Sequence, residues 1–457
     1  MAQASQAGAR GPAYRTCITD FWGGGRRRLA MARAWLPLLL LAWRCGALEL
    51  QGPEKRALAY DQVIQRMQYW KRPTSALPST GKYLLFSPDA GGLNNIRIGW
   101  EMIGLVAFHS NRTLVLPPKS RMYLLDFGPW NQALVGDTSN WTGSTRVEDL
   151  IDVTQLKGVL PTLTVEEFEA EAGVKWEQAR YEAEKAPPQG GHPLSDWSAL
   201  AGKFVFMSGE NREGFDMGQW WLQGGPRDEV RPEMTEVDWG LLRHGFVWHQ
   251  DVFSIAAKAV QYLGLFDYVA LHARYGDFAE KQSQRTPDQI YENWRPLIAN
   301  ASAMYVATDR QAQFDGFAQR HGVKLVMWPD LFTAATGGVL SADKQLYTPE
   351  RFFKLMGPVE EVICTFAKVF VGTDRSSFTG HIQRMRIHAD APVTQRLTHT
   401  DGNPFTHSTR EMQVPLEDIQ RSIQEWEQRD WVVPDITKGE HFRQKTTKLL
   451  RNISRRF

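Results

Sequence analysis

The sequence predicts an α/β protein made of two Rossmann-like domains that face each other across a cleft. The chain has 457 residues, of which 42% are hydrophobic and 23% charged, which is enough to bury the cores of two domains. Short β-rich runs alternate with longer helical runs in two series, one beginning at residue 82 and the other at residue 267. Such alternation is typical of parallel sheets with crossover helices. Ligands of these folds bind beyond the carboxyl ends of the strands, so the cleft is the expected site.

The first series predicts an N-terminal domain over residues 82–250. Its expected strands and helix, in chain order, are 82–87, 94–109 (helix), 113–118 and 203–208. The stretch 145–200 breaks the alternation, because it reads as a charged helix followed by a Pro/Gly linker. We interpret this stretch as an inserted arm whose glutamates lie on a solvated face.

The second series predicts a C-terminal domain over residues 265–400. A helix around 250–263 leads into it, and the domain boundary is expected near 245–265. Its strands are expected at 267–273, 304–309, 323–328 and 369–373. The remaining residues, 401–457, predict a helical tail that ends in a basic cluster.

Residues 1–48 have the pattern of a leader with a secretory signal peptide. Four arginines precede the apolar run AWLPLLLLAW at 34–43, and small residues follow it; the arginines are Arg26, Arg27, Arg28 and Arg33. Such a run is too short to span a bilayer of about 30 Å. A buried N-terminal helix is the alternative, and Met31 is an alternative start. We expect a protein of the secretory lumen, in the endoplasmic reticulum or Golgi, without a stable membrane span.

Cysteine use and glycosylation sequons agree with that compartment. Cys17 and Cys45 belong to the leader or precede it, and Cys364 lies in an apolar helical stretch, where we expect it to pack as a hydrophobic side chain. Four sequons occur, at Asn111, Asn140, Asn300 and Asn452. The formal net charge of +2 is too small to indicate a nucleic-acid partner.

Three polar clusters follow predicted strands. The first, SPDAGGLNNIR at 87–97, combines paired glycines with the start of a helix, where backbone amides favour an anion. A plain tight turn with Asn94 capping the helix is the alternative. The second, HARYGDF at 272–278, puts Arg274 after an apolar run, where a phosphate would satisfy it bidentately. A salt bridge to Asp277 is the alternative, and His272 by itself is compatible with a structural role.

The third cluster is FVGTDRSSFTGHIQRMR at 370–386. Ser376 and Ser377 stand where a helix begins, and that helix continues through Arg384 and Arg386. Free amides, two hydroxyls and the positive end of the helix dipole make an anion cradle, although serine is also an ordinary helix cap. Because three donor-rich strand ends occur in one two-domain chain, a diphosphate ligand explains them better than three unrelated turns.

The sequence offers no pattern for a metal or a nucleophilic hydrolase. It lacks the Asp-x-Asp motif with which metal-dependent glycosyltransferases hold a diphosphate, zinc-type spacing and a Gly-x-Ser-x-Gly elbow. We therefore expect no metal and no cofactor. Arginine and helix dipoles would have to neutralise a departing diphosphate, which predicts activity without added metal.

Taken together, GGLNNIR, HARYGDF and FVGTDRSSFTGHIQRMR, with MYVATD between the last two, resemble the GDP-fucose protein O-fucosyltransferases and their wider superfamily. The resemblance covers roughly residues 82–390. It implies a GT-B fold and an inverting, metal-independent transfer of fucose from GDP-fucose. It also implies a secretory location, with a protein hydroxyl or a glycan as acceptor.

The resemblance also implies roles for individual residues. Arg274 matches the essential arginine that would neutralise the β-phosphate as the sugar departs. The donor-binding residues that it implies are Gly92, Asn95 (with Asn94 as the other possibility), His272, Asp309, Glu360 at the guanine, Ser376, Ser377, Phe378, and Arg384 or Arg386.

Two departures from the family pattern leave the general base open. Tyr275 stands where many relatives carry a second arginine, and Gly91 stands where some carry a catalytic glutamate. Asp89, Glu101 and Asp277 are the candidate bases, and a mechanism driven by leaving-group departure is the alternative. A different donor such as UDP-rhamnose, or a non-catalytic binding role, also remains open.

Overall fold

The structure is a computed structural model of the whole chain. It describes residues 58–88, 92–123, 125–126, 144–185, 197, 200–208, 235–275, 286–298, 301–333, 338–340, 349–373, 376–389 and 391. The leader, the C-terminal tail and the sequons at Asn140, Asn300 and Asn452 lie outside these residues. Asn111 is exposed, at the turn before β2.

The first parallel sheet lies where the first alternating series predicted it. Its strands are β1 (Tyr83–Phe86), β2 (Thr113–Val115), β3 (Thr162–Leu163), β4 (Glu184–Lys185) and β5 (Phe204–Met207). They are ordered β3-β2-β1-β5-β4, and each neighbouring pair is parallel. Helix α3 (Leu93–His109) connects β1 to β2. The strands expected at 82–87, 113–118 and 203–208 and the helix expected at 94–109 are thereby confirmed, with ends that differ by up to three residues.

The described part of the stretch 145–200 belongs to the first sheet and is not a separate arm, whereas its Pro/Gly part at 186–196 lies outside the described residues. β3 and β4 form the two edges of the first sheet, and between them stand α6 (Val165–Ala172) and α7 (Trp176–Glu182). Phe168 and Trp176 on these helices pack against one face of the sheet. Strands of two residues carry no recognisable period, which is why the sequence did not indicate them. The glutamates of α6 do lie on the exposed side, where they pair with Arg146, Lys157 and Lys175.

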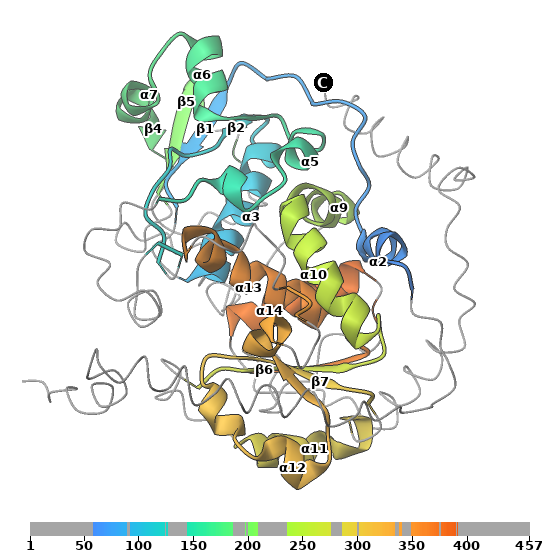
Figure 1. Cartoon of the computed structure of the whole chain (residues 1–457). Coiled ribbons are helices and arrows are strands. Elements are labelled where there is room, and N and C mark those ends of the chain that lie inside the picture. Colours follow the sequence, from blue (N-terminus) through green and yellow to red (C-terminus); the bar gives the residue numbers. More distant parts are fainter. Residues whose placement is uncertain are drawn as a thin grey trace, which may run out of the picture. The chain divides into compact units, whose positions relative to one another are not determined.

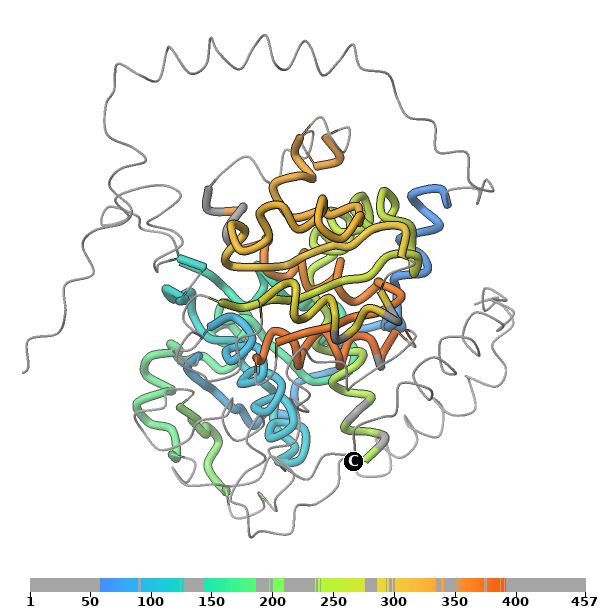
Figure 2. The backbone as a smooth tube through the Cα atoms, turned by 90° about the horizontal axis from the view of Figure 1, so that it is seen from below, coloured from blue at the N-terminus to red at the C-terminus, as the bar shows by residue number. Residues whose placement is uncertain are grey.

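The second sheet has four parallel strands, β6 (Val269–Ala273), β7 (Met304–Thr308), β8 (Leu325–Met327) and β9 (Val369–Gly372), in the order β8-β7-β6-β9. All four predicted strands are thereby confirmed. Val269 pairs in register with Val369, so segments far apart in sequence run side by side in Figure 2. The helices here are α10 (Gln250–Leu263), α11 (Pro287–Ile298), α12 (Phe317–His321), α13 (Pro349–Thr365) and α14 (Ser377–His388).

Helices cover both faces of the second sheet (Figure 1). Alternate residues of a strand point to opposite faces, and along β6 Ala270 packs in one hydrophobic cluster with α10, α13 and α14 while Val269 and Leu271 pack in another with α11 and α12. The first cluster also contains residues of β1 and α3. Cys364 is fully buried in it, as expected. The two sheets therefore share one apolar core.

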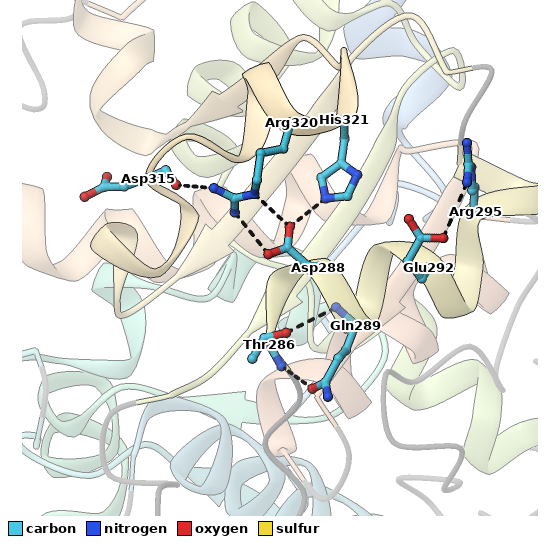
Figure 3. A network of polar contacts seen from close by, with 8 residues as sticks. All are labelled: Thr286, Asp288, Gln289, Glu292, Arg295, Asp315, Arg320 and His321. Atoms are coloured by element: carbon cyan, nitrogen blue, oxygen red, sulfur yellow. Dashed lines mark hydrogen bonds and ion pairs between the residues drawn. The ribbon is translucent and has the colours of Figure 1, made fainter.

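Polar contacts fix α11 and α12 on the outer side of the second sheet (Figure 3). The Asp288 carboxylate binds Arg320 at 3.1 Å and His321 at 2.6 Å. At the start of α11, Gln289 and Thr286 cap each other, since each backbone amide donates to the other's side chain. This network secures the helix that follows the loop after β6.

The remaining elements are α2 (Tyr60–Met67), α5 (Val153–Lys157), α9 (Glu236–Gly245) and the 3₁₀ turns Val147–Asp149, Gln311–Phe314 and Trp328–Phe332. Within the described ranges no helix is both long and apolar enough to cross a membrane. The described residues, from Leu58 to Ala391, belong to one compact unit.

Candidate functional site

The loops that leave β6 and β9 are joined by hydrogen bonds. The backbone amide of Arg274 donates to the Thr373 hydroxyl at 2.9 Å, and that hydroxyl donates to the carbonyl of His272 at 3.0 Å. Arg274 is half-buried at the end of its strand. Because the strands are adjacent and parallel, their carboxyl ends lie at one edge of the sheet. The second and third polar clusters of the sequence therefore meet at this edge.

The end of β7 joins the same edge through Asp309. Its carboxylate accepts a hydrogen bond from the backbone amide of Tyr275 at 2.7 Å. Tyr275 itself is buried, and burial raises the pKa of its phenol. The ring of Tyr275 packs beside that of Phe314.

Helix α14 begins directly beside these loops. Ser376 occupies the cap position, since its carbonyl accepts the first helical hydrogen bond from Gly380 at 2.9 Å. Its side chain is fully buried, and its hydroxyl has no hydrogen-bond partner among the described residues. Ser377 and Phe378 are half-buried in the first turn. A buried serine hydroxyl without a partner at a helix N-terminus is suited to an anionic ligand.

His272 connects β6 to that first turn. Its Nδ1 lies 2.8 Å from the Thr379 hydroxyl, and its ring lies 4.6 Å from the ring of Phe378. Gly372 allows this approach, because a Cβ atom there would come within 2.4 Å of Thr379. His272 is thus a buried side chain that contacts the first turn of α14.

The first glycine loop leads into α3, whose cap residue is Gly92 rather than Asn94. Gly92 is extended, with φ −68° and ψ 167°, and no side chain caps the helix. Asn94 is buried and donates to Glu361, so the alternative in which it caps the helix is wrong. Asn95 is half-exposed. Of the two asparagines, Asn95 is therefore the one placed to contact a ligand.

Two sequence predictions are contradicted by a buried ion cluster. Arg384 pairs with Glu101 at 2.5 Å, and Arg97 pairs with the same carboxylate at 3.2 Å. Each of these three residues is at most 5% exposed. Glu101 is not placed to serve as a general base, because its carboxylate is enclosed and paired with two guanidinium groups. Arg384 is likewise engaged between α14 and α3 through this ion pair.

Arg386 is also not a ligand contact. It is fully buried, and its guanidinium donates to the carbonyls of Thr365, Ala367 and Lys368 at 2.8, 2.5 and 3.1 Å. These carbonyls lie at and just beyond the end of α13, where helices leave acceptors unsatisfied. Arg386 therefore caps α13, and the prediction that it binds the donor is wrong.

Glu360 on α13 is half-buried and accepts a hydrogen bond from the Tyr305 hydroxyl at 2.9 Å. Burial raises the pKa of its carboxyl to about 8. The contact with Tyr305 places Glu360 beside β7.

Asp89 and Asp277, the other candidate bases, lie outside the described residues, as does Gly91. Within the described ranges no group of three His, Cys, Asp or Glu side chains could hold a metal ion. The sequence did not indicate Thr373, Thr379, Glu361 or His381, because uncharged threonines and buried helical residues carry no signal of their contacts. The position of Thr373 directly after a strand was the one local clue.

Comparison with known proteins gives a family match over most of the chain. Residues 83–388 match the family described as GDP-fucose protein O-fucosyltransferase. No curated protein matches the chain.

Solved structures resemble the chain at low identity. A crystal structure of POFUT1 in complex with GDP has 16% identity, covers 68% of this chain and 96% of its own, and gives a TM-score of 0.41. A NodZ α-1,6-fucosyltransferase soaked with GDP-fucose has 10% identity, with coverages of 68% and 93% and a TM-score of 0.38. An Arabidopsis thaliana FUT1 mutant in complex with GDP has 12% identity, with coverages of 77% and 76% and a TM-score of 0.37. The family match, and not these similarities, carries the assignment that follows.

Proposed function

As a member of the GDP-fucose protein O-fucosyltransferase family, the chain is a glycosyltransferase, and we propose that it transfers fucose from GDP-fucose to a hydroxyl of a secretory-pathway protein. We further propose that the transfer inverts the anomeric centre and needs no metal. The leader at 1–48 supports a secretory location in the endoplasmic reticulum or Golgi.

One observation carries this proposal. The backbone amide of Arg274 is hydrogen-bonded to Thr373 at the end of β9. Three residues later, at the start of α14, the buried hydroxyl of Ser376 has no hydrogen-bond partner among the described residues. A cationic side chain, a hydroxyl and a helix N-terminus at one sheet edge supply the donors that a diphosphate needs. Asn95 and Gly92 would add contacts from α3.

The chemistry follows from these groups. The acceptor hydroxyl attacks the anomeric carbon of fucose on the face opposite the diphosphate, the bond to the β-phosphate oxygen breaks, and the configuration inverts. The Arg274 guanidinium and the amides of α14 stabilise the charge that develops on GDP. The proton of the acceptor passes to a base outside the described residues, either Asp89 or Asp277, or to solvent once leaving-group departure is advanced.

The test is the turnover of GDP-fucose by wild type and by Arg274→Ala. Because a cation directed at developing phosphate charge contributes several kcal/mol at the transition state, we expect turnover to fall on the order of 10²-fold or more while the protein stays folded. Arg320→Ala is the matched control, since Arg320 is an exposed arginine on α12 that binds Asp288. Full activity in a folded Arg274→Ala protein would exclude this role.

Ligand-induced thermal shifts separate the donors. We expect stabilisation by GDP and GDP-fucose. Stabilisation by UDP alone would refute the GDP-fucose proposal in favour of another nucleotide sugar such as UDP-rhamnose. Binding of GDP-fucose without any hydrolysis or transfer would indicate a non-catalytic relative.

A further inference from the structure

Helix α13 contacts both helices whose N-termini contribute to the proposed donor site. The contacts come from Gly357 and Glu361, which are four residues apart and so lie on one face of the helix. Glu361 contacts Asn94 of α3 and His381 of α14. One turn earlier, Gly357 lies against Leu93 of α3 and near Phe378 of α14.

The carboxylate of Glu361 is the centre of this arrangement. It is fully buried, and one of its oxygens accepts from the Asn94 side chain. Its other oxygen accepts from Trp248 Nε1 at 3.2 Å and lies 2.7 Å from His381 Nδ1. Asn94, Trp248 and His381 belong to α3, to the segment before α10 and to α14. A single side chain therefore joins four separate segments by directional contacts.

Gly357 adds a second, apolar contact at the same junction. A Cβ atom at this position would lie 3.2 Å from Leu93 and 4.0 Å from Phe378. The first distance is tighter than an ordinary van der Waals contact, so a methyl group would require the Leu93 side chain at the start of α3 to shift by a few tenths of an ångström. The glycine lets α3 approach α13 closely, although glycine inside a helix costs about 1 kcal/mol relative to alanine.

A buried carboxylate such as that of Glu361 is not needed for stability alone. Burial raises the pKa of Glu361 to about 8, even with Arg97 and Arg384 nearby, so its ionised form is disfavoured. Apolar side chains of similar volume are often equally or more stabilising than buried ionic groups. Unlike apolar contacts, hydrogen bonds are directional, because they hold their partners at one distance and angle.

Resting on the proposed function, we propose that Glu361 is a positioning residue of the transferase. It holds the start of α3, which carries Gly92 and Asn95, at a fixed place relative to the start of α14, which carries Ser376 and Ser377. Gly357 supports this junction from one turn away. The two helix N-termini would thereby contact one donor in a single productive geometry.

The experiment compares Glu361→Leu and Glu361→Gln with Asp238→Asn as the matched control. Asp238 is also a fully buried carboxylate with a histidine partner, His109, at 2.7 Å. His109, however, is the last residue of α3, at the end of the helix opposite to Asn94. A change at Asp238 therefore removes a similar buried contact away from the start of α3. Steady-state turnover of GDP-fucose, GDP binding by calorimetry and urea unfolding are measured on each folded variant.

We expect Glu361→Leu to lower kcat about 10- to 100-fold, since displacement of reacting groups by about 1 Å can cost 10²-fold. Glu361→Gln keeps an acceptor for Asn94 and should lose less. Asp238→Asn should lower the unfolding midpoint without lowering kcat. Equal kcat values in Glu361→Leu and Asp238→Asn would overturn the positioning role, whereas absence of turnover in the wild type would overturn the proposed function itself.

A second pair of variants separates position from stability. Gly357→Ala and Gly240→Ala both replace a glycine inside a helix, but a Cβ at Gly240 meets no atom within 4 Å. Both gain helix propensity. We expect only Gly357→Ala to lower kcat, by about 3- to 10-fold. Unchanged kcat in Gly357→Ala would contradict the claim that this face of α13 sets the site.

Discussion

Replacing Arg386 by methionine tests the distinction between structural and functional arginines. Methionine keeps the length and apolar volume of the side chain and removes the three hydrogen bonds to Thr365, Ala367 and Lys368. The carbonyls of the α13 end would then be buried without a donor. Arg386 is itself fully buried, so water cannot readily replace it.

The expected loss follows from these contacts. A buried carbonyl left without a donor costs about 1–3 kcal/mol, and three of them give roughly 3–9 kcal/mol. Removing the guanidinium also removes the cost of burying its charge. The same burial lowers the pKa of Arg386 to about 9. We therefore expect a net loss of about 3–5 kcal/mol, as is common when one partner of a buried charged contact is removed.

Urea unfolding is the measurement. With a slope of about 3 kcal/mol per molar urea, the midpoint should fall by about 1 M or more. The affinity for GDP, measured by calorimetry below the transition, should match wild type. Arg274→Ala should give the converse, a folded protein with turnover lowered on the order of 10²-fold or more. An Arg386→Met protein with a wild-type midpoint and weakened GDP binding would refute the capping role and restore the donor contact that the sequence suggested.

Four further predictions test other parts of the structure. Gly372→Ala should lower the free energy of unfolding, measured in urea, by about 2–4 kcal/mol. Overpacking against Thr379 costs about 1–3 kcal/mol, and it also displaces the hydrogen bond between Thr379 and His272. An unchanged urea midpoint would show that α14 does not pack as described. Treatment with EDTA should leave turnover of GDP-fucose unchanged, and loss of activity restored by a divalent cation would disprove metal independence. The pKa of Glu361 is raised to about 8, so its contribution to stability should be complete below about pH 4.5 and lost as the pH rises through 8; unfolding curves of Glu361→Gln should lack this decline. Burial lowers the pKa of His244 to about 4 and that of His388 to about 3. These groups should therefore reduce the free energy of unfolding as the pH falls below about 6.5. A free energy of unfolding that stays constant between pH 6.5 and pH 4 would contradict their burial.

The strand ends of the candidate site could be predicted because their signals are local. An apolar run that ends in Gly or Arg and leads into a helix implies a loop at the carboxyl edge of a sheet, whatever its neighbours are. This is why the regions around Arg274 and Ser376 were found from sequence and do meet. The two-residue strands β3 and β4 gave no such signal, since their places depend on pairing with β2 and β5.

The directions of individual side chains could not be predicted. Arg384 and Arg386 looked equivalent in sequence, yet residues two apart on a helix point about 200° apart. One contacts Glu101 on α3 and the other contacts the end of α13. Asn94 and Asn95 differ in the same way, because only the packing of α13 against α3 decides which of them is buried.

The sequence by itself determined that this chain folds as two parallel sheets with donor-rich strand ends, since apolar periodicity, glycine and helix-capping residues act within a few residues. Only the tertiary structure decided which polar groups are paired inside the core and which lie at the carboxyl edge of the second sheet. Burial and pairing depend on helices distant in sequence, and a buried charge must be paired wherever the packing puts it. That requirement assigns Glu101, Arg384 and Arg386 to the core and leaves Arg274 and Ser376 at the sheet edge.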